Sequence, residues 1–375
     1  MDGPTNAWLA IMAGGIGSRF WPASRPDRPK QLLSFGPGAR TLLREAVNRG
    51  ATIAGRNRTL IVTSKSLQDP VCAHIDLLPL ENILAEPAKR NTLGAILYTT
   101  AAVLAMNDGG GDPVIGILPA DHHIGTPAVF AEDVSRAIEI ARDSDALVTI
   151  GIPPTRPETG YGYIETVNRN DSVTDVASFQ EKPDAATARQ FLRQGRFLWN
   201  SGMFFWRFST FMDELRRSNP EIAETAEKLF HAYAGGDAEA ICSLFAELPD
   251  ISIDYALMEQ AKNVKVVTAN FEWDDLGSWD SLPRVREVDE NGNVLVGSVV
   301  VTNCRGCVVY NEQTYPIAVM GLNEMVVAVG QRGILVTPIK QAQNVRELSS
   351  SARDIIADAK AAEKKSYRQD LGASG

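Results

Sequence analysis

The strongest constraint on the fold is an alternation of uninterrupted apolar runs with segments of helical period over the first 150 residues. The apolar runs, each predicted to be a strand, occupy residues 8–13, 59–63, 82–84, 114–118 and 147–150. Helices are predicted between them over residues 41–49, from Thr92 (with Asn91 as N-cap) and over residues 129–141. A strand without polar alternation is buried on both faces, and a helix between two such strands makes them parallel. The pattern therefore predicts an α/β domain with a mainly parallel sheet.

The pattern changes further along the chain. Two alternating strands at residues 163–167 and 173–181 suggest an antiparallel excursion, and Asp184 is expected to cap a helix. Further helices are expected up to about residue 260, before a strand at residues 264–269. After Pro283, short β-rich runs follow one another with only polar and glycine turns between them, which suits a small sandwich, a barrel or a few coils of a β-helix. These runs begin at Val294, Val299, Cys307, Ile317, Met325 and Ile334, and a polar helix is expected over residues 341–367.

Length and charge limit the domains and the partners. The 375 residues suggest two or three domains, which we place at residues 1–284, 285–340 and 341–375. The net charge of −9 argues against broad binding to nucleic acid or to an anionic membrane. Four scattered cysteines, without a signal peptide or a membrane-spanning run, predict a soluble cytoplasmic protein. Cys304 and Cys307 have C-x-x-C spacing without a second pair, so we expect turn or core cysteines rather than a metal site.

A glycine-rich turn leaves the first predicted strand and runs into a basic stretch. Because glycine has no Cβ, Gly14, Gly15 and Gly17 let backbone N–H groups approach phosphates closely. Four cations follow against the single Asp27, namely Arg19, Arg25, Arg28 and Lys30. The combination predicts an anion cradle at the carboxyl edge of a parallel sheet, the alternative being a tight turn with solvated arginines. The spacing fits neither a Walker P-loop nor a dinucleotide fingerprint.

Carboxylates follow two of the predicted strands. Asp121 comes just after the run at residues 114–118, and Asp274 and Asp275 come after the strand at residues 264–269. Strand-end aspartates can converge on one Mg²⁺, which takes few carboxylates beside substrate phosphates and water. The alternative is that Asp121 caps a helix and that the other two are turn residues. The neighbours His122 and His123 do not suit zinc, since adjacent side chains rarely face one ion.

Eight segments, in the correct order, resemble elements of the sugar-1-phosphate nucleotidyltransferases. The first, AGGIGSRFWPASRPDRPKQLL, resembles the opening of that family in its mannose-1-phosphate guanylyltransferase version. The others are EPAKRNT (86–92), LPADHHI (118–124), GYGYIE (160–165), FQEKPD (179–184), LWNSGMFFW (198–206), SIDYALME (252–259) and WDDLGSW (273–279). The chain departs from the family pattern at Leu93-Gly94 and at Ser18-Arg19-Phe20. We expect these changes to adjust packing, and a bearing of Leu93 on base recognition stays open.

The resemblance implies a fold and a set of site residues. The fold would be a Rossmann-like nucleotidyltransferase domain, then a short left-handed β-helix-like domain and a terminal helix, and the chain would form a homodimer. The implied nucleotide-binding residues are Gly14, Gly15, Gly17, Ser18, Arg19, Lys30, Glu86, Arg90 and Asn91. The implied sugar-phosphate-binding residues are Tyr161, Gly162, Glu181, Lys182 and Asn200. Asp121 and Asp275 would hold Mg²⁺, with Asp274 less favoured, and the catalytic set would be Arg19, Lys30, Asp121 and Asp275.

The implied reaction joins GTP and mannose 1-phosphate to give GDP-mannose and pyrophosphate. The attacking phosphate is already anionic, so no strong general base is needed, and positioning does most of the work. Another nucleotide or sugar phosphate stays open, as does a catalytically silent subunit that senses nucleotide sugars. We set an NAD-dependent oxidoreductase aside, because the region expected to carry a ribose-binding acid is polar and proline-rich. We also do not expect a second, isomerase activity.

Overall fold

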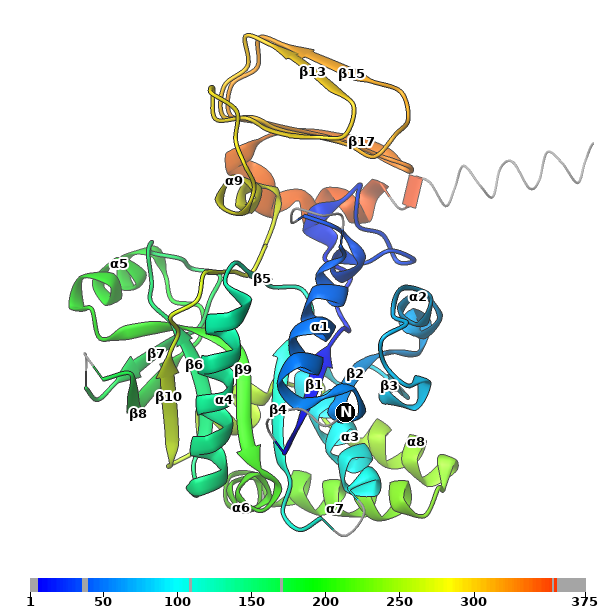
Figure 1. Cartoon of the computed structure of the whole chain (residues 1–375), viewed down its shortest axis with the longest axis vertical. Coiled ribbons are helices and arrows are strands. Elements are labelled where there is room, and N and C mark those ends of the chain that lie inside the picture. Colours follow the sequence, from blue (N-terminus) through cyan, green and yellow to red (C-terminus); the bar gives the residue numbers. More distant parts are fainter. Residues whose placement is uncertain (1–5, 36–39, 108–109, 169–170, 353, 356–375) are drawn as a thin grey trace, which may run out of the picture. The chain divides into compact units, whose positions relative to one another are not determined.

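The computed structural model of the chain describes residues 6–35, 40–107, 110–168, 171–352 and 354–355 (Figure 1). The chain divides into two compact units. Unit 1 comprises Met1–Gly14 and Leu43–Trp273, and unit 2 comprises Gly15–Leu42 and Asp274–Gly375. The chain therefore leaves unit 1 directly after its first strand and returns to it in α1 (Leu42–Ala54).

Unit 1 is built on a nine-stranded sheet with the strand order β3-β2-β1-β4-β9-β6-β10-β8-β7. The strands are β1 (Ala7–Met12), β2 (Thr59–Ser64), β3 (Ile83–Glu86), β4 (Val114–Pro119), β6 (Leu147–Ile152), β7 (Tyr163–Thr166), β8 (Val173–Gln180), β9 (Phe197–Arg207) and β10 (Val264–Thr268), with a short β5 (His123–Ile124) outside this sheet. Neighbours among β3, β2, β1 and β4 pair in parallel, as do β6 and β10, whereas β7 and β8 are antiparallel. The predicted α/β class and the antiparallel excursion are confirmed.

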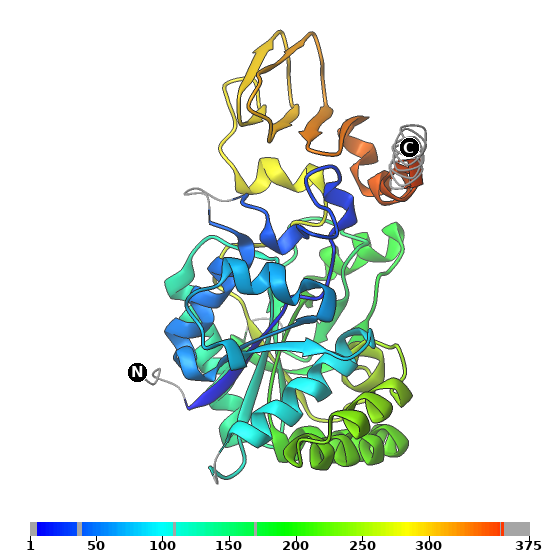
Figure 2. The same cartoon turned by 90° about the vertical axis from the view of Figure 1, so that its right-hand side faces the viewer.

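Helices cover both faces of this sheet (Figure 1, Figure 2). On one face, α3 (Asn91–Met106), α6 (Phe208–Ser218), α7 (Pro220–Ala234) and α8 (Ala238–Glu247) contribute to one core cluster. On the other face, α1, α4 (Pro127–Asp143) and α5 (Ala185–Gln194) contribute to a second cluster. A further short helix, α2, spans Gln68–His74. Asp184 caps α5 as predicted, because its carboxylate accepts the N–H of Thr187 at 2.8 Å. Within the described parts of the chain, no helix has both the length and the apolar character needed to cross a membrane.

The prediction that helices follow one another from residue 184 to about residue 260 is wrong at β9. This eleven-residue strand pairs antiparallel with both β4 and β6 in the middle of the sheet. Its side chains alternate between the two core clusters: Phe204 and Trp206 belong to one, and Met203 and Phe205 to the other. A strand buried on both faces shows no polar alternation, and only its enrichment in aromatic residues distinguishes it from a buried helix.

Unit 2 combines the segment after β1 with the C-terminal strands. The first segment holds two short 3₁₀ turns, Ser18–Phe20 and Lys30–Leu32. After β11 (Trp273–Asp274) come a 3₁₀ turn (Trp279–Ser281) and α9 (Leu282–Val285). Six strands follow: β12 (Val294–Val296), β13 (Val299–Thr302), β14 (Val308–Asn311), β15 (Ile317–Met320), β16 (Met325–Gly330) and β17 (Gly333–Pro338).

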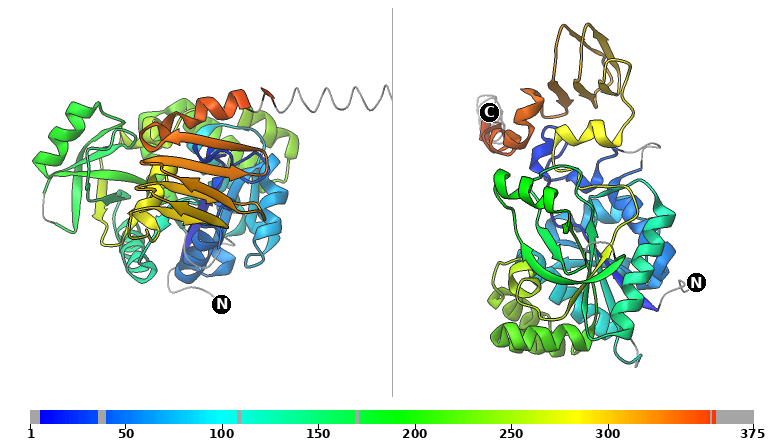
Figure 3. Two further views of the ribbon diagram at one scale, coloured as in Figure 1. Left: turned by 90° about the horizontal axis from the view of Figure 1, so that it is seen from above. Right: turned by 90° about the vertical axis from the view of Figure 1, so that its left-hand side faces the viewer.

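The strands of unit 2 stack as successive coils (Figure 3). β12, β14 and β16 pair in parallel in one sheet, β13 and β15 pair in parallel in another, and β17 folds back antiparallel on β16. Coils that place one strand in each of two parallel sheets are the arrangement of a β-helix, so the predicted β-helix-like domain is confirmed. Of the helix predicted over residues 341–367, the structure describes a 3₁₀ turn at Ile339–Asn344 and helix over residues 345–352, and residues 356–367 lie outside the described part.

Candidate active site

Three predicted site residues of unit 1 lie where neighbouring parallel strands end. β1 is followed by Gly14, β4 is followed by Asp121, and β3 ends on Glu86. β1 and β4 stay paired past their ends, since the N–H of Ala120 donates to the carbonyl of Met12 at 3.1 Å. A Cβ added to Gly14 would lie 3.8 Å from Glu86 Oε1. All three residues therefore belong to one carboxyl edge, which is where α/β sheets bind ligands.

Among the three residues at this edge, Glu86 has a strongly raised pKa. The residue is only 9% exposed, and burial raises the pKa of its carboxyl from 4.5 to about 7. A carboxyl group with a strongly raised pKa beside a ligand-binding edge is typical of a functional site. In its charged form, its two oxygens can accept two parallel N–H bonds from a planar group.

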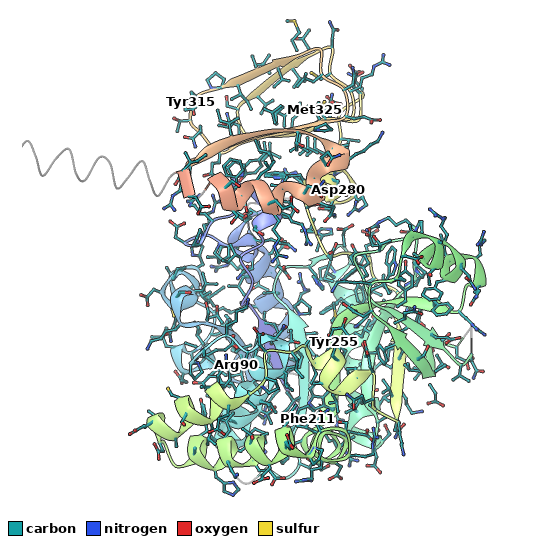
Figure 4. The ribbon with its side chains drawn as sticks, turned by 180° about the vertical axis from the view of Figure 1, so that it is seen from behind. Arg90, Phe211, Tyr255, Asp280, Tyr315 and Met325 are labelled. Carbon is teal, nitrogen blue, oxygen red and sulfur yellow. The ribbon has the colours of Figure 1, made fainter. Side chains whose placement is uncertain are left out.

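Arg90 and Asn91 stand at the start of α3, the helix that follows β3. The sequence predicts Asn91 as the N-cap; this is wrong, because Arg90 is the N-cap and Asn91 is already helical. Asn91 has a φ of 55°, and its own Oδ1 accepts the N–H of Thr92 at 2.9 Å. Arg90, labelled in Figure 4, donates from Nη2 to the carbonyl of Ala246. The side chain of Arg90 is thus held against the end of α8.

The departure from the family pattern at Leu93 and Gly94 is explained by packing. Leu93 is fully buried in the core cluster that contains α3. A Cβ added to Gly94 would lie 2.4 Å from Arg90 Cβ and 3.1 Å from the ring of Phe245. Gly94 therefore leaves the space that Arg90 and Phe245 occupy.

Four residues implied to bind the sugar phosphate lie together near the ends of β7, β8 and β9. A Cβ added to Gly162 would lie 2.5 Å from Glu181 Oε2 and 3.4 Å from Asn200 Cβ, so a side chain at residue 162 would displace its neighbours. The N–H of Asn200 donates to the carbonyl of Gly162 at 2.8 Å. Lys182 pairs with Glu181 at 2.5 Å, and its side chain is 62% exposed. The cluster thus presents a carboxylate, an amide and an accessible ammonium group.

Asp254 extends this cluster and is assigned no role by the sequence analysis. Asn200 Nδ2 donates to Asp254 Oδ1 at 2.8 Å, while Asn200 Oδ1 accepts the N–H of Gly202 at 3.1 Å. These two bonds fix the orientation of the Asn200 amide. Asp254 begins a π-helical turn (Asp254–Met258), and burial, followed by the charge of Glu181, raises its pKa. A sequence signal existed, because Asp254 is an acid inside the largely apolar stretch of SIDYALME.

Tyr161 belongs to an aromatic group. Its ring centroid lies 5.2 Å from that of Trp199 and 5.5 Å from that of Trp273, and Arg156 Nη2 donates to its hydroxyl at 3.1 Å. Trp273 Nε1 in turn donates to His122 Nδ1 at 3.1 Å. The group forms a rigid wall beside the cluster of Gly162, and it holds His122 in one orientation.

In unit 2, the glycine turn folds back onto Lys30. Gly17 has a φ of 67°, and a Cβ added to it would lie 2.2 Å from Lys30 Cβ, so both backbone and space require glycine. Lys30 is 6% exposed, and its Nζ donates to the carbonyl of Asp275 at 2.5 Å. The structure therefore brings Lys30 to the WDDLGSW segment. Arg19, by contrast, is exposed.

The other residues of the basic stretch do not all join an anion cradle. A Cβ added to Gly15 would meet no atom within 4 Å, and Ser18 begins a 3₁₀ turn. Arg25 and Arg28, predicted to add free positive charge, instead pair with Glu312 at 3.1 and 2.9 Å. The predicted cradle of four cations is therefore wrong for these two arginines, because the buried Glu312 carboxylate engages both of them and Asp27 also pairs with Arg25, at 3.1 Å.

The two neighbouring aspartates of WDDLGSW have different surroundings. The side chain of Asp274 is 4% exposed and binds Arg284 through two bonds, to Nε at 2.5 Å and to Nη2 at 3.2 Å. Asp275 is half-buried, and its Oδ1 accepts the N–H of Gly277 at 3.1 Å. Asp274 is thus committed to the fold. Among the described residues, no group of three or more His, Cys, Asp or Glu side chains is placed to hold a metal ion.

The C-x-x-C pair lies in the core of the β-helix, as predicted. Cys304 and Cys307 are buried free thiols that pack with Val309. Their Sγ atoms donate to the carbonyls of Val319 and Leu322 at 3.6 and 3.4 Å. Packing accounts for both cysteines.

Two family models match the chain in the order that the sequence suggests. A model described as nucleotidyl transferase matches residues 10–292. A second, described as MannoseP isomerase/GMP-like beta-helix domain, matches residues 297–350.

Relatives extend this similarity over most of the chain. Mannose-1-phosphate guanylyltransferase of Klebsiella pneumoniae is 37% identical over 350 residues, which cover 90% of this chain and 72% of that protein. Xanthan biosynthesis protein XanB of Xanthomonas campestris pv. campestris (strain B100) is also 37% identical, over 92% of this chain and 72% of that protein. The crystal structure of mannose-1-phosphate geranyltransferase from Thermus thermophilus has a TM-score of 0.83 at 35% identity, over 93% of this chain and 100% of that one. The chain thus belongs to the nucleotidyl transferase family and carries the beta-helix domain found with it.

Proposed function

We propose that the chain transfers GMP from GTP to mannose 1-phosphate, giving GDP-mannose and pyrophosphate. The observation that carries the proposal is that Gly14, Glu86 and Asp121 all lie at one carboxyl edge of the sheet, with Gly14 next to Glu86. Relatives named mannose-1-phosphate guanylyltransferase support the choice of substrates. A glycine turn, a purine acceptor and a metal-binding carboxylate are the groups that this reaction requires.

On the nucleotide side, each proposed contact follows from the chemistry of the residue. The backbone of Gly14, Gly15, Gly17 and Ser18 lines the phosphates, and Arg19 and Lys30 offset their charge. The Glu86 carboxylate accepts N–H bonds from the guanine edge. Arg90 and Asn91 complete the base and phosphate pocket at the start of α3.

On the sugar side, Glu181 and Asn200 hold the hydroxyls and Lys182 holds the phosphate. Carboxylate and amide groups fix the orientation of hydroxyls, and an exposed lysine offers a mobile point charge. Gly162 leaves room beside Glu181, and Tyr161 lines the pocket with its ring. The amide of Asn200, fixed by Asp254 and Gly202, keeps one N–H and one lone pair for the sugar.

The reaction is an in-line displacement at the α-phosphorus of GTP. An oxygen of the sugar phosphate forms the new P–O bond, the bond from the α-phosphorus to its bridging oxygen breaks, and pyrophosphate leaves with that oxygen. Because the nucleophile is already an anion, no side chain has to remove a proton. Arg19, Lys30 and Lys182 lower the repulsion between the two polyanions, and the pocket orients them.

We propose Asp121 and Asp275 as the ligands of Mg²⁺. Carboxylate oxygens suit this ion, which needs few protein ligands when phosphates and water complete its shell. The engagement of Asp274 with Arg284 supports Asp275 as the ligand of the two neighbours. Bound Mg²⁺ supplies positive charge to the phosphate oxygens.

We also propose that the chain acts as a cytoplasmic homodimer. Unit 2 exposes the apolar side chains of Val300, Met320, Ile334 and Val336, which a second copy would cover. All four cysteines are free, which fits a reducing compartment. Light scattering on the purified protein measures the mass directly, and a monomer at micromolar concentration would contradict the dimer.

A substrate panel tests the function. The protein is offered each nucleoside triphosphate with each of several sugar 1-phosphates and Mg²⁺, and pyrophosphate is measured. We expect kcat/KM to be at least about tenfold higher for GTP with mannose 1-phosphate than for any other pair. Preference for another pair would replace the substrates, and turnover with no pair would favour a silent sensing subunit.

The proposed metal site is tested by removing the metal ion and, separately, by replacing its two proposed ligands. A chelator should abolish turnover and added Mg²⁺ should restore it. Asp121→Asn and Asp275→Asn should each lower kcat by about a hundredfold or more, whereas Asp250→Asn, at an exposed aspartate of unit 1, should leave kcat unchanged. A folded Asp275→Asn variant with normal turnover would remove Asp275 from the metal site.

A further inference from the structure

The loop that carries the glycine turn belongs to unit 2, where it packs on the C-terminal strands. Trp279 Nε1 donates to the carbonyl of Trp21 at 3.1 Å, and the ring of Trp279 lies 5.2 Å from that of Phe20. A Cβ added to Gly330 would lie 2.6 Å from the carbonyl oxygen of Pro22, and one added to Gly333 would lie 2.5 Å from the ring of Trp21. The turn between β16 and β17 therefore lies directly against the loop.

One carboxylate, that of Glu312 in the turn after β14, forms ion pairs with this loop. Its side chain is 8% exposed, and its two oxygens are shared between two arginines: Oε1 lies 3.1 Å from Arg25 Nη1, and Oε2 lies 2.9 Å from Arg28 Nη1. Gln331 also holds the carboxylate, since its N–H donates to the same Oε1 at 3.2 Å. The N–H of Glu312 itself donates to the carbonyl of Val329 at 3.0 Å. The position of Glu312 is thus set by β16 and by the turn that follows it.

The segment that Glu312 pairs with, residues 25–28, is a closed turn that leads directly to Lys30. The N–H of Arg25 donates to the carbonyl of Arg28, and the reverse bond has the same length of 3.0 Å. Asp27, at the tip, pairs with Arg332 at 3.0 Å. Lys30 follows two residues after Arg28, and its Nζ donates to the carbonyl of Asp275. Moving the turn would therefore move Lys30.

We propose that Glu312 is a positioning residue of the nucleotide-binding loop: it acts through Arg25 and Arg28 to hold Lys30 in its place for the triphosphate. The inference rests on the proposed function for the identity of the nucleotide. Exposed ion pairs contribute little to structure, but a buried carboxylate shared by two guanidinium groups fixes both. Its loss leaves Arg25 with only Asp27, at 3.1 Å, and removes the ion pair of the half-buried Arg28. The β-helix domain thereby contributes to nucleotide binding.

The test compares Glu312→Gln with Glu324→Gln, which removes the charge of an exposed carboxylate of the same unit paired with Lys340. Hydrogen exchange of residues 15–35 is measured without nucleotide, at a temperature where both variants are folded. We expect faster exchange in this loop for Glu312→Gln only. KM for GTP should rise about tenfold, and KM for mannose 1-phosphate should change less than twofold. Glu312→Asp, which keeps the charge, should recover part of the loss.

Unchanged exchange in the loop of Glu312→Gln overturns the inference, whether or not the protein is active. Faster exchange with an unchanged KM for GTP also overturns it, because Glu312 would then be merely structural. If the wild-type protein turns over no substrate pair, the proposed function fails separately. The GTP dissociation constant, measured by calorimetry, then replaces KM. The inference is overturned if this constant is equal for the wild type and Glu312→Gln, or if the wild type does not bind GTP.

Discussion

At the scale of single residues, burial sets the chemistry of Glu86 and Asp254. Both carboxyl groups have raised pKa values, and in both the largest cause is the cost of burying the charged form. Neither shift could be predicted from sequence, because each depends on neighbours that only the fold assembles. The residue types were nevertheless visible in the motifs EPAKRNT and SIDYALME.

The raised pKa of Glu86 makes GTP binding depend on pH. With a pKa of about 7, the carboxylate fraction rises about tenfold between about pH 6 and about pH 8. If the carboxylate accepts the guanine N–H bonds, KM for GTP should fall by up to about tenfold over this range. Glu86→Gln should show a higher KM with little pH dependence. A wild-type KM for GTP that stays flat across the range would contradict this role.

The same shift affects stability with a defined sign. The folded-state pKa of Glu86 lies above the ordinary value of 4.5, so its contribution is fully present below about pH 4.5 and is lost as pH rises through about 7. Glu86→Gln should therefore gain up to about 3 kcal/mol in free energy of unfolding relative to wild type above pH 7. Urea unfolding at acid and alkaline pH measures the difference, and an equal ΔΔG at both would contradict it.

Asp254 should act on the sugar through Asn200. Asp254→Ala removes one of the two bonds that orient the Asn200 amide, so KM for mannose 1-phosphate should rise about tenfold while KM for GTP stays the same. The double variant with Asn200→Ala should be no worse than Asn200→Ala alone. Asp250→Ala is the control. Additive effects in the double variant would show that Asp254 acts independently of Asn200.

At the scale of elements, the parts that sequence predicts best are those with an unambiguous period. The strands of the first half, the cap at Asp184 and the short C-terminal strands all appear near their predicted positions. β9 was missed because it inserts antiparallel between β4 and β6 and is buried on both faces. The N-cap of α3 was missed because Asn91 adopts a positive φ and uses its side chain within the first turn.

The contact between the β16–β17 turn and the loop makes an element-scale prediction. Gly333→Ala forces a Cβ to within 2.5 Å of the Trp21 ring, so it should lower the free energy of unfolding by about 1–3 kcal/mol and raise KM for GTP. Gly235→Ala, where the nearest atom is 3.4 Å from the added Cβ, is the control for the loss of a glycine. Equal free energies of unfolding for the two variants would show that the Trp21 ring moves away from the added Cβ at little cost.

At the scale of the whole molecule, the chain does not divide at one point in sequence. The boundary predicted near residue 284 separates the loop at Gly15–Leu42 from the strands with which it forms unit 2. The pairing of Arg25 and Arg28 with Glu312 joins residues more than 280 positions apart, as the separations of 287 and 284 show. No local pattern encodes such a contact, so the sequence could identify the cations but not their pairing with Glu312.

A chain of residues 1–284 should therefore lack a functional nucleotide loop. Phe20, Leu33 and Phe35 would lose the side chains of β12, β14 and β16 against which they pack. We expect this truncated chain to bind GTP at least about a hundredfold more weakly than the full chain, measured by calorimetry. A truncated chain that binds GTP as the full chain does would show that unit 2 is dispensable for the nucleotide.

The central claim is that mannose 1-phosphate attacks the α-phosphorus of GTP. The most direct measurement follows a label placed on the α-phosphate or the γ-phosphate of GTP during turnover with mannose 1-phosphate and Mg²⁺. We predict that the α-label appears in GDP-mannose and the γ-label in pyrophosphate, in equal amounts. An α-label recovered in free GMP, or no transfer to the sugar phosphate, would contradict the account.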